Sequence, residues 1–127
     1  MNGKADMIED NDMDQTVNCP KGAILDTWSS HEWTDGIQIE TLRDLDELVV
    51  QTENSIYEIT VISPHSGEIL VRGGQFFPDF APARLAGASL GGSFLKMRGI
   101  YVGFKMEIHA DLRVIITSYV RKISARI

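Results

Sequence analysis

The sequence predicts a mainly all-β fold: a small antiparallel β-barrel or sandwich of five to seven short strands, behind an acidic flexible N-terminal segment. Three observations predict it. Apolar and polar residues alternate in several short segments after Leu48, turn signals separate these segments, and no segment has the periodicity of a long helix. A chain of 127 residues has room for one domain, and its single cysteine excludes an intramolecular disulfide.

The charge distribution divides the chain into an acidic front and a basic end. Residues 1–35 hold eight acids and two lysines, and residues 36–83 hold eight acids and two arginines. From Arg84 onward there are eight bases and two acids, and the formal net charge of the whole chain is −6. This polarity predicts either charges interleaved on one folded surface, or a basic face that meets an anionic partner or the acidic leader itself.

Three regions are predicted along the chain. Residues 1–24 lack hydrophobic periodicity, which predicts a disordered acidic tail. Residues 25–46 are interpreted as an arm or linker with two tryptophans, in which the spacing of apolar residues over 39–45 predicts one short helix. Residues 47–127 form the predicted β-barrel domain. The chain has no apolar signal core and no apolar run near the roughly 20 residues of a spanning helix, so we expect a cytoplasmic protein without membrane contact.

The strands follow from a hydrophobic period of two. The alternating set in LVVQT (48–52) has the opposite phase to that in IYEITV (56–61), and one uninterrupted strand cannot change phase. Residues 53–55 are therefore predicted to hold a turn or a bulge. After a turn signal over 63–67, the further predicted strands are EILVR, FKMEIH and RVIITSYV, with a turn at Ala110-Asp111 between the last two.

The stretch GASLGGSFLKMRG (87–99) has the composition of a phosphate-binding loop. Aligning its glycines with G-x-x-x-x-G-K-[ST] puts Ser93 where the lysine must be, so the motif is not met. We interpret these glycines as bends of a small curved sheet. Lys96 and Arg98 remain candidates for a weak anion site beside Gly91-Gly92.

The candidate interface residues are Phe76, Phe77 and Phe80. Phe76 and Phe77 are consecutive and point to opposite faces of a strand, so one of them is expected to fill the core. Pro78 lacks an N–H and is predicted to end the ladder, with residues 78–86 as a loop. Either this loop buries the remaining rings over one end of the barrel, or the rings form a patch for self-association or a ligand.

Polar candidate binding residues lie in two clusters, one at the phase change and one near the C-terminal end. Short hydroxyl and amide side chains at such places usually bond to backbone groups of bulges and turns. If they instead converge with Lys96 at one barrel mouth, they form a small polar pocket. The full set of candidates is Thr52, Asn54, Ser55, Tyr57, Lys96, Arg98, Thr117 and Ser118.

No catalytic or metal-binding constellation is found in the sequence. His31-Glu32 begins like H-E-x-x-H, but Asp35 replaces the second histidine. Cys19 has no nearby base that would lower its pKa. The sequence therefore predicts no metal, no cofactor and no enzymatic activity.

Four blocks carry a resemblance: TENSIYEITV (52–61), GGQFFPDFAPARLAGASLGGSFLK (73–96), GIYVGFKMEI (99–108) and ITSYVRKI (116–123). They resemble a group of short bacterial proteins of no assigned function, with the pattern T-x-N-S-x-Y, G-G-x-F-F-P and T-S-x-V. The resemblance implies one small domain of similar all-β shape and no activity.

Three interpretations of function follow. The favoured one is a non-catalytic binding or interaction module whose partner is another protein or a second copy. The first alternative is a single-stranded nucleic-acid-binding barrel that uses the basic C-terminal half, although the overall acidity of the chain counts against nucleic acid. The second is a self-associating structural protein.

Overall fold

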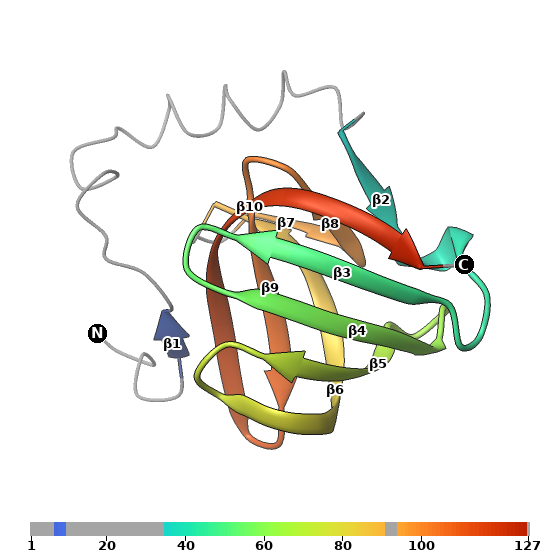
Figure 1. The fold of residues 1–127 in the computed structure, drawn as a ribbon, viewed down its shortest axis with the longest axis horizontal. Coiled ribbons are helices and arrows are strands. Elements are labelled where there is room, and N and C mark those ends of the chain that lie inside the picture. Colours follow the sequence, from blue (N-terminus) through green and yellow to red (C-terminus); the bar gives the residue numbers. More distant parts are fainter. Residues whose placement is uncertain (1–6, 10–34, 91–93, 127) are drawn as a thin grey trace.

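The structure, a computed structural model, describes residues 7–9, 35–90 and 94–126 (Figure 1). Within these residues the chain forms ten β-strands and one short 3-10 turn. The elements are β1 (Met7–Glu9), β2 (Gly36–Gln38), η3 (Ile39–Thr41), β3 (Glu47–Thr52), β4 (Ile56–Ser63), β5 (Glu68–Gly73), β6 (Phe77–Ser89), β7 (Leu95–Met97), β8 (Gly99–Tyr101), β9 (Lys105–Ala110) and β10 (Arg113–Arg126).

Six of these strands close into an antiparallel ring, β3-β4-β5-β6-β9-β10, in which β10 pairs back with β3. Figure 1 shows β3, β4 and β5 in front, with β9 and β10 behind them. The closing strand β10 pairs with β9 through its first half and with β3 from Val120 onward. Irregular register in its middle lets one strand serve both neighbours. The predicted all-β barrel is confirmed.

A turn lies where the hydrophobic pattern changes phase between the first two predicted strands. Leu48 and Val50 point inward from β3, and Tyr57 and Ile59 point inward from β4. The intervening residues 53–55 absorb the odd count, so both strands present their apolar side chains to the interior.

Apolar side chains from every strand of the ring fill the barrel. Burial of each large one stabilises the fold by about 1.5–3 kcal/mol relative to exposure. The buried residues of this main core cluster are Ile39, Leu48, Val50, Tyr57, Ile59, Val61, Ile69, Val71, Phe77, Leu85, Ile100, Met106, Ile108, Ala110, Ile115 and Val120.

The prediction that Pro78 ends a strand, with residues 78–86 as a loop, is wrong. These residues belong to the 13-residue strand β6, which pairs with β5 through Arg84 and with β9 only from Arg84 onward. Pro78 lies where the register of β6 against β5 shifts, and Pro82 has a described ladder partner on one side only. A missing N–H is tolerated on such an open side, so the prolines do not break the strand.

The short helix predicted over residues 39–45 is a single 3-10 turn, Ile39–Thr41. Ile39 is buried and Leu42 packs against the core, but Leu45 is 69% exposed. Leu45 has a φ of 70°, and its N–H donates to the carbonyl of Val61 at 2.6 Å. This bond to β4 turns the chain out of the helical path after one turn. Nearby, β2 pairs with β8 in a separate two-stranded sheet.

The segment predicted as a tail contributes strand β1, which pairs in parallel with Val114–Ile116 of β10. Figure 1 shows β1 beside the first part of β10. The remainder of residues 1–34, with both tryptophans, lies outside the described residues. None of the helical structure in the described part of the chain is long and apolar enough to cross a membrane.

Candidate functional site

A shallow pocket of about 220 Å³ opens on the outer face of the barrel, over β3, β4, β5 and β6. Figure 1 shows this face toward the viewer, with no described element lying over it. The side chains of Leu48 and Ile59 point into the core, so these residues give the pocket mainly its backbone floor. The lining residues are Glu47, Leu48, Glu58, Ile59, Thr60, Arg72 and Phe80.

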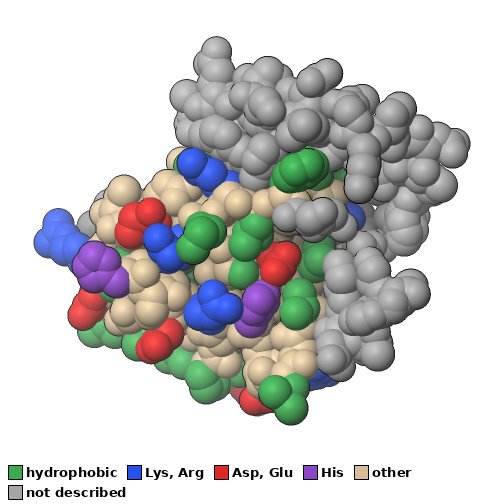
Figure 2. Space-filling model, turned by 180° about the vertical axis from the view of Figure 1, so that it is seen from behind, with side chains coloured by type: hydrophobic (Ala, Val, Ile, Leu, Met, Phe, Trp, Pro, Cys, Tyr) green, Lys and Arg blue, Asp and Glu red, His purple; other side chains and the backbone are tan. Residues whose placement is uncertain are grey.

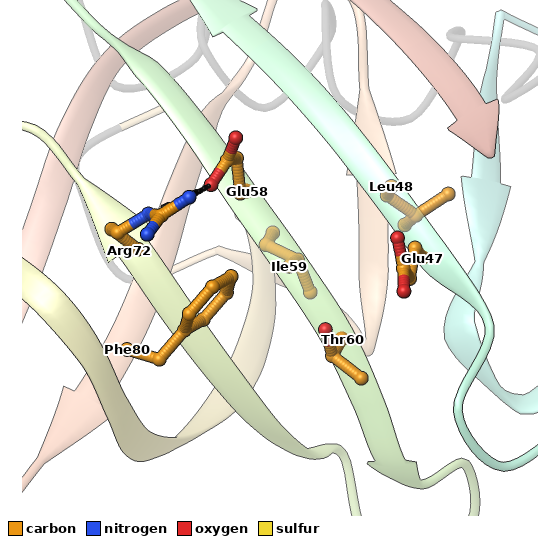
Figure 3. Close-up of a pocket in the computed structure, with 7 residues that line it drawn as sticks. All are labelled: Glu47, Leu48, Glu58, Ile59, Thr60, Arg72 and Phe80. Atoms are coloured by element: carbon orange, nitrogen blue, oxygen red, sulfur yellow. Dashed lines mark hydrogen bonds and ion pairs between the residues drawn. The ribbon is translucent and has the colours of Figure 1, made fainter.

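Strand register brings the polar walls of the pocket together. Glu58 on β4 is the direct partner of Arg72 on β5, and both side chains point outward. The guanidinium of Arg72 donates from Nε to Glu58 Oε1 at 2.8 Å and makes a second contact to the same oxygen through Nη2. Its Cζ also lies 4.5 Å from the ring centroid of Phe80. Figure 3 shows Arg72 between Glu58 and Phe80 on one side of the pocket, with Glu47 and Thr60 on the other.

The lining of the pocket carries more acidic than basic side chains. The lining has two carboxylates, Glu47 and Glu58, against one guanidinium, which gives a net charge of −1. An Arg stacked on an exposed aromatic ring gains about 0.5–1 kcal/mol and holds that ring in one orientation. In the structure, Arg72 bonds one carboxylate oxygen of Glu58 and covers one face of the Phe80 ring.

Exposed apolar side chains surround the pocket on the same strands. Phe80 is 43% exposed, Ile56 57% and Ile62 37%. Aromatic and Arg side chains amid apolar neighbours are typical of the centres of protein–protein interfaces.

The two predicted polar clusters do come together, at the β3–β4 turn. Thr52 Oγ1 bonds with the N–H and the carbonyl of Ser55, at 3.1 Å each. The N–H of Asn54 donates to Ser118 Oγ at 3.1 Å. Thr117 Oγ1 accepts from the N–H of Met106 at 3.0 Å and donates to the carbonyl of Ser118. These hydroxyls bond backbone groups at a turn and a bulge, which is the structural use that the sequence favoured.

Tyr57, the other candidate of this group, is 1% exposed and belongs to the core. Its hydroxyl oxygen would lie 2.6 Å from a Cβ placed on Gly74, which has a φ of +63°. Only glycine therefore fits against the Tyr57 ring at the β5–β6 turn. The T-x-N-S-x-Y block thus contacts both the T-S-x-V block and the G-G-x-F-F-P block.

Lys96 and Arg98 lie in another part of the fold, along β7 and the bend before β8. The register pairs Lys96 with Ala88 of β6. The N–H of Arg98 donates to the carbonyl of Ala86 at 2.8 Å, and its Nε lies 3.5 Å from Glu40 Oε1. The structure thus assigns Arg98 to a contact with η3. Gly91-Gly92 lie outside the described residues.

The three phenylalanines have different environments. Phe77 is 4% exposed in the core, and Phe76 is half-buried against it. Phe76 also lies beneath Arg113, with 6.0 Å between Cζ and the ring centroid. Only Phe80 presents a largely open ring, and its partner is Arg72.

The basic C-terminal half does not present all its aromatic and basic side chains as one exposed group. Tyr101 and Lys105 are each 4% exposed, and Lys105 Nζ lies 5.1 Å from the ring centroid of Tyr119. Figure 2, seen from behind the view of Figure 1, shows basic, acidic, histidine and apolar side chains interspersed over the described part of that face. On β6 and β9, His109 lies between Arg84 Nη2, at 2.9 Å, and Glu107 Oε2, at 2.8 Å.

Sequence reasoning missed Glu47, Glu58, Thr60 and Arg72. The signal for Glu58, Thr60 and Arg72 was present, because each lies at an outward position of a predicted strand. Glu47 lies one residue before the predicted strand 48–52 and is the first residue of β3. Without the register, nothing in the sequence shows that Arg72 meets Glu58 or that Phe80 lies beside it.

No protein-family model, curated protein or solved structure matches this chain. Among the described residues, no group of three or more His, Cys, Asp or Glu side chains is arranged to hold a metal ion.

Proposed function

We propose that this protein is a non-catalytic interaction module whose outer pocket takes a basic side chain of a partner protein. The observation that carries the proposal is the Glu58–Arg72–Phe80 arrangement on a sheet face over which none of the described elements lies. Arg72 is fixed from two sides, so little side-chain entropy remains to be lost when a partner binds.

The size of the pocket supports a side chain as its occupant. Pockets for free small molecules and cofactors usually measure about 300–1,000 Å³, and this one is smaller, at about 220 Å³. A single Arg or Lys head group fits this volume. The exposed side chains of Ile56 and Ile62 on β4 supply apolar contact area for the partner outside the pocket.

A displayed peptide library tests the proposal directly. Peptides are selected on the wild-type protein and counter-selected on Phe80→Ala, with Leu112→Ala as the matched control. Leu112 is 89% exposed in the β9–β10 turn and does not line the pocket. We expect enriched peptides to carry Arg or Lys and to bind Leu112→Ala with unchanged affinity.

Glu58→Gln separates charge recognition from apolar adhesion. This substitution should lower the affinity of the selected peptides by about tenfold, roughly 1.4 kcal/mol. Lys→Gln in the peptide should lower the affinity equally. Equal binding of peptides to wild type and Phe80→Ala, or enrichment without basic residues, would contradict this proposal.

A second copy of the chain is one outcome of the same test. In that case static light scattering shows a mass that rises with protein concentration, and Phe80→Asp returns the protein to the monomer mass of 14.1 kDa. The sequence-based alternative of self-association through residues 76–80 then rests on Phe80, because Phe77 is buried.

A further inference from the structure

The stagger of the barrel leaves one stretch of β10 without β3 as a neighbour. β3 ends at Thr52, which pairs with Val120. The part of β10 before Val120 pairs with β9 on one edge, and over Val114–Ile116 its other edge pairs with β1. When β1 leaves this edge of β10, the strand presents unpaired N–H and C=O groups that accept another extended chain.

β1 is a strand that another extended chain can replace at the edge of β10. It is three residues long, and it forms the one parallel pair among the strands that the structure describes. Residues 10–35 separate it from β2. So short a ladder makes few hydrogen bonds, and the tether compensates by an effective concentration on the order of millimolar.

Charge favours an acidic chain at this edge. Arg113 directly precedes the stretch of β10 that pairs with β1, and this stretch contains no acid, whereas residues 6–14 around β1 contain five acids and no base. Complementary charge of this kind raises the rate of encounter and fixes orientation.

We propose that the β10 edge at Val114–Ile116 is a strand-addition site for an extended acidic peptide of a partner protein, and that Met7–Glu9 is its internal occupant. Main-chain hydrogen bonds supply the affinity in this mode of recognition. A partner binds only when β1 leaves, so β1 lowers the apparent affinity by the fraction of time that it occupies the edge. This site is separate from the outer pocket and does not depend on it.

The probe is a fluorescein-labelled peptide with the sequence of residues 5–12, ADMIEDND, measured by anisotropy at low salt. The test variant of the full chain is Ile8→Pro/Glu9→Pro. Adjacent residues of a strand direct their N–H groups to opposite sides, so two consecutive prolines remove the N–H that faces β10 in either register. The control, Asn11→Pro/Asp12→Pro, also removes one carboxylate but lies outside β1.

We expect the test variant to bind the peptide at least tenfold more tightly than wild type or control. Equal affinity for all three proteins, or no binding by the test variant at a protein concentration of about 1 mM, overturns the proposal.

Amide chemical shifts locate the binding. The peptide should shift the amides of Val114–Ile116 in the test variant, and shifts confined elsewhere contradict the site. Arg113→Glu in the test variant should weaken the peptide more than Lys122→Glu does, because Lys122 lies on the part of β10 that pairs with β3. An equal effect of the two reversals would show attraction by overall charge alone.

Discussion

The N–H of Asn54 donates to Ser118 Oγ across 64 positions of the chain, at 3.1 Å. Beside it, the N–H of Glu53 donates to the carbonyl of Tyr119 at 3.0 Å. These bonds tie the β3–β4 turn to the irregular middle of β10, where that strand passes from β9 to β3. Polar groups therefore add to the β3–β10 ladder at the point where β10 changes neighbour.

Replacing Ser118 tests the contact between the β3–β4 turn and the middle of β10. Ser118 is 0% exposed, and Ser118→Ala leaves the N–H of Asn54 without its acceptor. We expect a loss of about 1–2 kcal/mol in the free energy of unfolding, measured by urea denaturation. Ser124→Ala, at an exposed position of the same strand, is the control and should change stability by less than about 0.5 kcal/mol. Equal losses would show that Ser118 carries no special bond.

Thr117→Val tests the second buried hydroxyl in the irregular middle of β10, because it removes the hydroxyl and keeps the shape of the side chain. The N–H of Met106 then lies in the interior with no hydroxyl to accept its bond. We expect a loss of about 1–3 kcal/mol, and thermal unfolding should shift by about 4–8 °C per kcal/mol in a domain of this size. Thr60→Val on the outer face of β4 is the control. A Thr117→Val protein as stable as the control would contradict the assigned role.

Gly74→Ala should destabilise the protein more than Gly103→Ala. Both glycines have positive φ, +63° and +89°, so both alanines are strained in the backbone. A Cβ on Gly74 also meets Tyr57 Oη at 2.6 Å, whereas nothing lies within 4 Å of a Cβ on Gly103. The difference between the two variants in urea denaturation therefore measures the contact with Tyr57. No difference would mean that the ring moves aside freely.

Stability should fall at high pH through Tyr101. Burial raises the pKa of its hydroxyl above the ordinary 10.0, and the nearby Glu40 carboxylate adds to this rise. The hydroxyl donates to Gln38 Oε1 at 2.9 Å, a bond that the phenolate cannot make. Because the folded pKa is the higher one, the contribution of Tyr101 is intact below pH 10 and is lost as pH rises through the folded pKa.

The measurement compares urea midpoints of wild type and Tyr101→Phe from pH 8 to pH 11. Wild type should lose stability more steeply above pH 10, and the two curves should converge there. Parallel curves over the whole range would show that ionisation of Tyr101 is not linked to unfolding.

The local pattern was sufficient for most of the barrel. The opposite phases of residues 48–52 and 56–61 required a turn between them, and the structure has one at residues 53–55. The pattern failed at Pro78, because whether a proline breaks a strand depends on whether a neighbouring strand needs its N–H. It failed again at Leu45, where a bond to Val61 outweighs the helical spacing.

The candidate site was less accessible to sequence reasoning. Phe80 was a candidate, but Glu58 and Arg72 were not, because charged residues at outward positions of strands are ordinary. Their meeting depends on the register of β4 against β5, which is fixed by packing of the opposite, apolar face.

Three signals in the sequence determined that this chain forms a small all-β domain with its apolar side chains inside. They are the alternation of apolar residues, the turn residues and the glycines. These signals act over a few neighbouring residues, so they can be read locally. Only the tertiary structure decided that β10 closes the ring, that Ser118 holds the β3–β4 turn, and that Arg72 lies between Glu58 and Phe80. Such contacts join residues far apart in the chain, and their partners are chosen by register and stagger once the whole interior is packed.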